Sequence, residues 1–222
     1  TYTGTGSSNA VTGVGFRPDF VWIKGRDFSD NHNLYDIVRG VEKRITSNGS
    51  GVQEDRPAGL TAFGSDGFTV NTANGENKSS APIVAWNWRA GNAQGSSNTD
   101  GSINTTYTSV STTAGFSISQ YTGTASTATV GHGLGVTPSV VLTKNLSADS
   151  NWQMYHIGLT SNNYRIALDS NDAEGGDSTA WNNTSPTSSV FSVGTSFRTN
   201  GSGNSIIAYC FADKRGFSKF GK

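Results

Sequence analysis

The chain has 222 residues with sixteen acidic and sixteen basic side chains, and charged residues make up only 14 % of it. A formal net charge of zero leaves no basic excess to follow a phosphate backbone, which argues against a nucleic-acid partner. No apolar run reaches the roughly 18 residues of a membrane span, and a single cysteine, Cys210, excludes an intramolecular disulfide framework.

Short strands separated by Gly, Asn and Ser are predicted along the first part of the chain. Phe20 to Ile23 is continuously apolar, which is typical of a central strand that is covered on both faces. Amphipathic helix signals are nearly absent. The predicted strands are Tyr2 to Thr5, Ala10 to Phe16, Phe20 to Lys24, Leu34 to Val38, Lys43 to Ser47, Gly67 to Asn71 and Ile83 to Arg89.

The last of these strands alternates in character. Val84, Trp86 and Trp88 share one face, because successive side chains of a strand point to opposite sides. We therefore expect Trp86 and Trp88, together with Trp22, to be buried in the core of the first module.

The second part of the chain repeats the first. Tyr2-Thr3-Gly4-Thr5 returns as Tyr121-Thr122-Gly123-Thr124, and the segment from Pro18 to Ile37 aligns with Pro138 to Ile157. A repeat of this length predicts two similar folded modules. The expected fold is all-β, with two tandem antiparallel β-sandwich modules of jelly-roll or lectin-like form that arise from an internal duplication.

The expected boundaries follow from this alignment. Residues 1–92 form the first sandwich, residues 93–114 form a linker with one edge strand near Thr106 to Val110, and residues 115–222 form the second sandwich. Gly115-Phe116-Ser117 recurs as Gly216-Phe217-Ser218. We therefore expect two units of a longer array, or a subunit that meets copies of itself, because an unpaired edge strand is a template for another chain. The absence of an initiator methionine favours a processed product or a piece of a longer protein.

No residue pattern predicts catalysis. The three histidines are His32, His132 and His156. His132 is expected in a surface turn, and His156 occupies the position that Asp36 has in the first copy. There is no HExxH or Cys-His spacing and no GxSxG turn. Cys210 is expected to be a buried structural thiol. The sequence thus predicts no enzyme activity and no cofactor.

The stretch from Asp169 to Asn183 in the second copy is the candidate binding site. It differs from its counterpart in the first copy, Ser47 to Asp55, which has no tryptophan. Carbohydrate sites on β-sandwiches commonly pair an exposed aromatic ring with Asp or Asn side chains. The alternatives are a Ca²⁺ site made by the acidic loop and a solvated loop in which the tryptophan caps the end of the sandwich. The candidate glycan-binding residues are Asp169, Asn171, Asp172, Trp181 and Asn182.

Longer motifs in both copies resemble a known family of protein domains. The stretch Gly15 to Lys24, followed by Asn33 to Gly40, resembles a repeat domain of unknown function in structural and tail-fibre-like proteins of bacteriophages. The companion form of that domain, which often lies beside concanavalin-A-like or laminin-G-like domains, is resembled in the second copy by Val130 to Gly135, Trp181 to Asn183, Ala208 to Ala212 and Gly216 to Gly221.

The resemblance implies a non-enzymatic structural protein of a virion or tail that acts in assembly and surface display. Its implied partners are copies of itself, other virion proteins and host surface glycans, with neither nucleic acid nor a membrane among them. A carbohydrate-binding adhesin is the alternative function, and a polysaccharide-degrading tailspike with paired carboxylates is a third.

Overall fold

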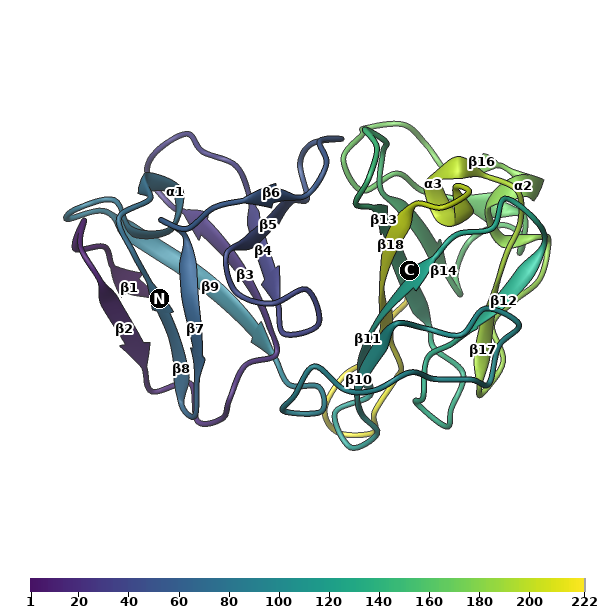
Figure 1. Cartoon of the computed structure of the whole chain (residues 1–222), viewed down its shortest axis with the longest axis horizontal. Coiled ribbons are helices and arrows are strands. Elements are labelled where there is room, and N and C mark those ends of the chain that lie inside the picture. Colours follow the sequence, from purple (N-terminus) through teal and green to yellow (C-terminus); the bar gives the residue numbers. More distant parts are fainter. Residues whose placement is uncertain (222) are drawn as a thin grey trace.

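Antiparallel strands dominate the structure, a computed structural model that describes residues 1–221 (Figure 1). The first half holds β1 (Tyr2–Thr3), β2 (Asn9–Thr12), β3 (Phe20–Gly25), β4 (Asn33–Asp36), β5 (Lys43–Thr46), β6 (Glu54–Asp55), β7 (Leu60–Gly64), β8 (Gly67–Val70), α1 (Asn74–Asn77) and β9 (Pro82–Trp88). The second holds β10 (Tyr107–Ser111), β11 (Phe116–Thr122), β12 (Ala128–Gly131), β13 (Val140–Asn145), β14 (Gln153–His156), β15 (Tyr164–Arg165), β16 (Gly175–Gly176), α2 (Ser178–Trp181), β17 (Val190–Val193), α3 (Phe197–Asn200) and β18 (Ser205–Phe211). Among residues 1–221, no helix is long and apolar enough to cross a membrane.

The sheets stack in four layers (Figure 1). Outermost in the first half is a three-stranded sheet in the order β2-β8-β7, which packs on a six-stranded sheet in the order β1-β9-β3-β4-β5-β6. The second half pairs a five-stranded sheet, β10-β11-β18-β13-β14, with the two-stranded sheet β12-β17 and α2, and a small sheet, β15-β16, lies in a loop. The two large sheets face each other in the middle of the molecule. The predicted all-β class of antiparallel sandwiches is confirmed.

The same strand order occurs in both halves. The order β9-β3-β4 in the first large sheet matches β18-β13-β14 in the second, and β2-β8 matches β12-β17. The repeated Tyr-Thr-Gly-Thr stretch lies at the same place in each half. Its glycine touches the backbone that follows α1 or α3: a Cβ on Gly4 would lie 2.1 Å from the Lys78 carbonyl oxygen, and one on Gly123 would lie 2.3 Å from that of Gly201. Only glycine fits so close an approach.

Three apolar cores fill the spaces between the four layers. β3 serves two of them, because its side chains alternate between the faces of the sheet. Val21 and Ile23 enter the core of the first sandwich, whereas Phe20 and Trp22 point toward the second half. This double burial explains the continuous apolar run of β3. We call the middle core, between the two large sheets, the shared core.

The shared core joins the halves through aromatic rings and buried hydrogen bonds. The ring centroids of Phe20 and Tyr209 lie 4.6 Å apart, although the two residues come from opposite halves. The Trp152 indole donates to the Thr46 carbonyl oxygen at 2.9 Å, and the Tyr209 hydroxyl donates to Asp36 Oδ2 at 2.6 Å. The two sandwiches therefore form one packed unit.

This packing corrects the expectation for the tryptophans. Trp86 is 45 % exposed, and Trp22 and Trp88 are only half-buried. The predicted burial of Trp86 is wrong, because the bulky face of β9 is turned toward the other half rather than into its own sandwich.

Residues 93–114, expected as a linker, lie against the second half. β10 is an edge strand paired with β11, at residues 107–111, close to the predicted position. Ile103 forms a parallel bridge with Val130 and is buried in the core of the second sandwich.

Candidate functional site

An open cleft of about 520 Å³ lies between the two halves, beside the shared core. The first half contributes residues of β3, of the loop before β4 and of the turn after β5, and the second half contributes the loop after β15. We call it the inter-half cleft. Its lining residues are Trp22, His32, Ser47, Asn48, Leu168, Asp169, Ser170 and Asn171.

One tryptophan lines the cleft, and a second tryptophan packs against it. Trp22 lines it, and Trp86 of the neighbouring strand packs edge-on against Trp22 with the ring centroids 6.2 Å apart. Trp86 lies opposite Trp22 in the β3–β9 ladder and keeps 45 % of its surface exposed. An exposed indole face beside a polar groove is suited to stacking on the apolar face of a sugar ring.

A histidine fixes the orientation of Trp22. The Trp22 indole N–H donates to His32 Nδ1 at 2.9 Å, so the His32 proton resides on Nε2 in the neutral ring. Burial lowers the pKa of His32 from its usual value, and the nearby Lys24 lowers it further. His32 is therefore a neutral acceptor for the indole at neutral pH.

Polar side chains from both halves also line the cleft and are held by hydrogen bonds. Asn48 Oδ1 accepts from the His32 backbone N–H at 2.9 Å, and the Asn48 amide donates to Asn31 Oδ1 at 3.0 Å. Asp169 Oδ1 accepts from the Trp152 backbone N–H at 3.1 Å, and Oδ2 accepts from the Asn151 amide at 3.3 Å. These bonds place carboxylate and amide groups from both halves beside one aromatic surface.

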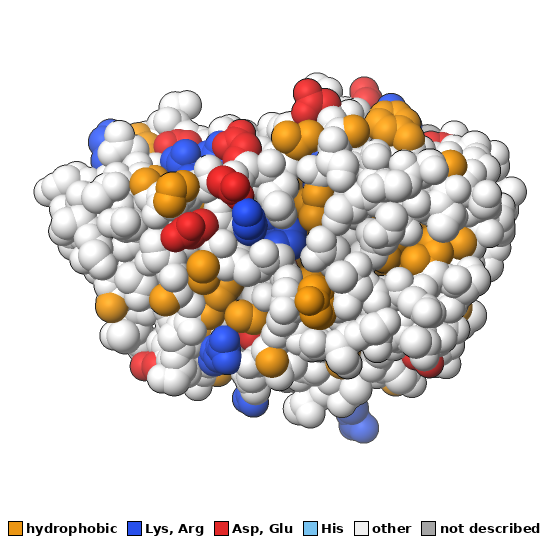
Figure 2. All heavy atoms as spheres, viewed as in Figure 1, with side chains coloured by type: hydrophobic (Ala, Val, Ile, Leu, Met, Phe, Trp, Pro, Cys, Tyr) orange, Lys and Arg blue, Asp and Glu red, His pale blue; other side chains and the backbone are white. Residues whose placement is uncertain are grey.

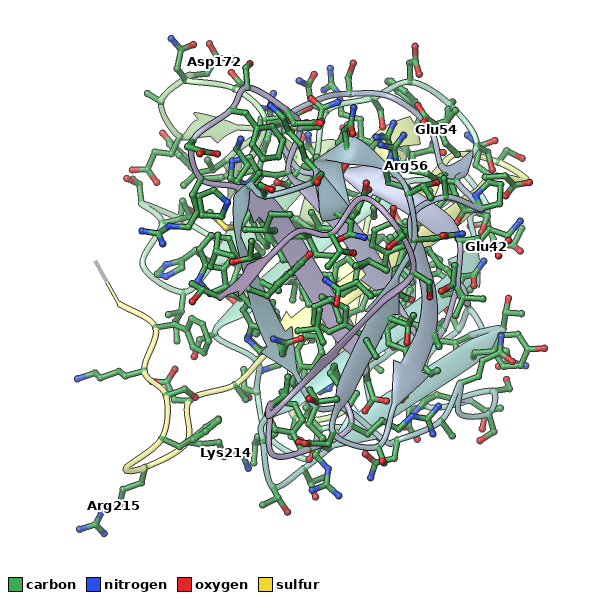
Figure 3. The ribbon with its side chains drawn as sticks, turned by 90° about the vertical axis from the view of Figure 1, so that its left-hand side faces the viewer. Glu42, Glu54, Arg56, Asp172, Lys214 and Arg215 are labelled. Atoms are coloured by element: carbon green, nitrogen blue, oxygen red, sulfur yellow. The ribbon has the colours of Figure 1, made fainter. Side chains whose placement is uncertain are left out.

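The structure divides the predicted glycan-binding residues. Asp169 and Asn171 line the inter-half cleft. Asp172 stands at the tip of its loop and points away from the protein (Figure 3). Trp181 is 2 % exposed and packs edge-on against Tyr155, so it presents no face to a ligand and its predicted stacking role is wrong. Asn182 follows it in a left-handed conformation, with φ 52°, at the end of α2.

Sequence reasoning missed Trp22, Trp86, His32 and Asn48 as site residues. The first two were interpreted as core because the equivalent face of the second copy is also bulky. No signal in the sequence separates these positions from core positions, because their exposure depends on how the second half packs against them.

The carboxylates of the acidic loop, residues 169–177, bond to different partners in the part of the chain that the structure describes. Asp177 caps α2 by accepting from the Thr179 backbone N–H, and Glu174 accepts from Thr160. No group of three His, Cys, Asp or Glu side chains in residues 1–221 is placed to hold a metal ion. Ca²⁺ binding at this loop remains a prediction.

The remaining candidates for chemistry are structural groups. Cys210 is buried as predicted, and burial raises its pKa to about 12, so the thiol stays protonated. His132 is fully buried, which corrects its predicted place in a surface turn, and its Nδ1 accepts from the Leu134 backbone N–H. Asp36 is paired with Arg39 in the protein interior.

Behind the cleft lies a buried lysine that links the halves. Lys144 Nζ donates to the carbonyl oxygens of Ser50 and Ser150 at 2.9 Å each, and Ser50 belongs to the first half. Burial lowers the pKa of Lys144 from 10.5 to about 8, and Asp169 and Asp149 offset part of this effect.

We expect Lys144 to make the free energy of unfolding depend on pH in the alkaline range. Between pH 8 and 10.5 the unfolded chain holds the Lys144 proton and the folded chain releases it, so stability rises with pH across this window. The free energy of unfolding of the unmodified chain, minus that of Lys144→Met, should therefore increase from pH 8 to 10.5 in urea titrations. A constant or falling difference would contradict the burial of the charged amine.

One family matches this chain: Domain of unknown function (DUF7483), along residues 1–222. No curated protein and no solved structure matches it.

Proposed function

The chain belongs to the DUF7483 family along residues 1–222, and we propose that it is a non-enzymatic structural component of a bacteriophage virion or tail. The observation that carries this proposal is the shared core. It fuses two sandwiches into one block of four layers, which suits a part that must hold its shape in a particle surface. The resemblance of the Gly15–Lys24 and Ala208–Gly221 stretches to phage structural repeats supports the same role.

The surface is compatible with such a role. Figure 2 shows a face made largely of backbone and of side chains that are neither charged nor hydrophobic, with charged groups scattered among them. With a net charge of zero, little long-range repulsion opposes close packing of copies. A test is mass spectrometry of density-gradient-purified particles of the phage or prophage that encodes the chain. Absence of its peptides from particles whose other structural proteins are detected would contradict the proposal.

Carbohydrate binding at the inter-half cleft is a second candidate function. It is favoured by the exposed Trp86 ring, which packs against Trp22, and by the polar residues Asn48, Asp169 and Asn171 that line the cleft together with Trp22. Glycoside hydrolysis commonly needs two carboxylates that flank the scissile bond. Asp169 is the one carboxylate among the described lining residues, so the cleft supports binding rather than this form of turnover. The proposed ligand class is host surface polysaccharide.

Trp86→Ala is expected to weaken glycan binding by about tenfold or more, which corresponds to roughly 1.4 kcal/mol. The reason is that the variant removes the exposed stacking surface and leaves the buried cores intact. Binding would be measured on a glycan array and then by calorimetry with the best ligand. Phe197→Ala is the matched control, because Phe197 is also an exposed aromatic residue, at 49 %, on α3. Equal weakening by both variants, or release of reducing ends from the ligand, would contradict a binding cleft.

A further inference from the structure

The connection between β5 and β6 bonds the first half to the second, and it contains an Asn-Gly pair, Asn48-Gly49. Before the pair, the Thr46 carbonyl oxygen accepts from an indole N–H of the second half at 2.9 Å. After the pair, the Ser50 carbonyl oxygen accepts from Lys144 Nζ of the second half, also at 2.9 Å. The pair thus lies in a turn whose two ends are bonded to the other half (Figure 1).

An asparagine that is followed by glycine is prone to lose its side-chain nitrogen as ammonia. In this reaction the next backbone nitrogen attacks the side-chain amide carbon, and glycine has no Cβ to hinder the approach. The chain contains three such pairs, Asn48-Gly49, Asn74-Gly75 and Asn200-Gly201. The surroundings of each pair decide whether it can react.

The surroundings of Asn48 favour the reaction. Its side chain is exposed, and within residues 1–221 the Gly49 N–H donates no hydrogen bond, so this nitrogen is available to lose its proton to water. Asn48 Oδ1 accepts from the His32 backbone N–H at 2.9 Å. Such a donor stabilises the negative oxygen that forms when the nitrogen attacks the amide carbon.

The other two asparagines are held in unreactive arrangements. Asn74 begins α1, where its carbonyl oxygen accepts from the Lys78 N–H at 3.1 Å, and the helical ψ turns the next nitrogen away from the side chain. Asn200 is fully buried, and its amide donates to the Ser126 and Gly194 carbonyl oxygens at 2.6 and 2.8 Å. These bonds fix the Asn200 amide, and burial keeps water away from it.

We propose that Asn48 is a site of self-modification, in which the Gly49 nitrogen attacks Asn48 Cγ and the bond from Cγ to Nδ2 breaks. The Gly49 nitrogen gives its proton to water, and Nδ2 takes a proton from water and leaves as ammonia. The succinimide ring that closes is then opened by a water molecule. Opening at Cγ gives aspartate, and opening at the backbone carbonyl carbon gives isoaspartate, in which the backbone runs through the side-chain CH₂ and is longer.

Both products change the junction between the halves. The new carboxylate stands in the inter-half cleft, which Asp169 also lines, and the amide that donates to Asn31 Oδ1 at 3.0 Å is lost. In isoaspartate, the longer backbone must also fit between the anchored carbonyl groups of Thr46 and Ser50. Since the reaction consumes only water, it is independent of the proposed role in a particle.

Peptide mapping by mass spectrometry, during incubation of the folded chain at neutral pH, tests the site. Conversion at Asn48 should be roughly tenfold or more faster than at Asn74 or Asn200. In concentrated urea the three asparagines should convert at similar rates, because the folded surroundings are lost. Similar rates in the folded chain, or the same preference for Asn48 in urea, would overturn the proposal.

Two glycine variants of the same turn provide a matched pair. Gly49→Ala should slow the conversion of Asn48 roughly tenfold, because the added methyl group hinders the attack. A Cβ at Gly49 would meet only Thr46 Oγ1, at 3.3 Å, so the variant keeps the fold. Gly51→Ala is the control and should leave the rate unchanged, because a Cβ there meets nothing within 4 Å. Equal rates in the two variants would contradict attack by the Gly49 nitrogen.

The products themselves test the effect on the junction. The isoaspartate form, separated by chromatography, should unfold at a lower urea concentration than the Asn48→Asp chain. That variant carries the new charge on a backbone of normal length, so the comparison isolates the longer backbone. Equal unfolding midpoints would refute the effect on the contact between the halves.

Discussion

Asp36→Ala is expected to lower the free energy of unfolding by about 3–5 kcal/mol, as is typical when one partner of a buried ion pair is removed. Asp36 is fully buried and bonds the Arg39 guanidinium of its own half and the Tyr209 hydroxyl of the other half. Its Oδ1 also accepts from the backbone N–H groups of Val38 and Arg39. The variant therefore leaves a buried cation, a buried hydroxyl and two buried amides without their acceptor.

Urea denaturation followed by tryptophan fluorescence would measure this loss. Asp55→Ala is the matched control, because Lys43–Asp55 is also a pair of a cation with an aspartate but is exposed, and such pairs contribute roughly 0–1 kcal/mol. Tyr209→Phe separates the contribution between the halves and should cost about 1.5–3 kcal/mol. A cost for Asp36→Ala no larger than that of Asp55→Ala would show that the shared core does not depend on this network.

Strand positions were the part of the fold that the sequence could predict. Alternation and turn residues place β3, β9 and their equivalents, because the pleat forces side chains to opposite faces. The strands β6 and β7 were missed, since Glu54–Asp55 is short and charged and the stretch from Leu60 carries a bulge. The contact between the halves was also missed. A face of bulky residues predicts burial but cannot say which layer buries it.

The sequence does not show which layer covers a bulky face, and this also explains why the site residues were partly mispredicted. Trp86 and Trp181 exchange their expected roles, because exposure depends on where the neighbouring layer ends and not on residue type. Trp181 comes from the variable loop, but α2 turns its ring inward against Tyr155. Asp169 and Asn171 were found because their loop differs between the copies. Their partners Trp22 and Asn48 lie far away in sequence and join them only through packing of the halves.

Asn200→Ala is expected to lower the free energy of unfolding by about 3 kcal/mol. The Asn200 amide is fully buried and donates to the carbonyl oxygens of Ser126 and Gly194 at 2.6 and 2.8 Å. Its Oδ1 accepts from the Thr124 backbone N–H at 2.8 Å. The variant leaves these three backbone groups unpaired, and each buried unpaired group costs about 1–3 kcal/mol unless water reaches it.

The first half contains an equivalent asparagine, Asn77. Asn77 of α1 accepts from the Thr5 backbone N–H at 2.8 Å and donates to the Ser7 and Asn71 carbonyl oxygens, so it secures the first Tyr-Thr-Gly-Thr stretch as Asn200 secures the second. Asn77→Ala should therefore cost about as much as Asn200→Ala, and Asn104→Ala, on an exposed residue, should change stability by less than about 0.5 kcal/mol. Thermal and urea unfolding of the three variants would measure this. If Asn77→Ala and Asn200→Ala behaved like Asn104→Ala, the repeated stretch would owe its position to the close glycine contacts of Gly4 and Gly123 rather than to the asparagine bonds.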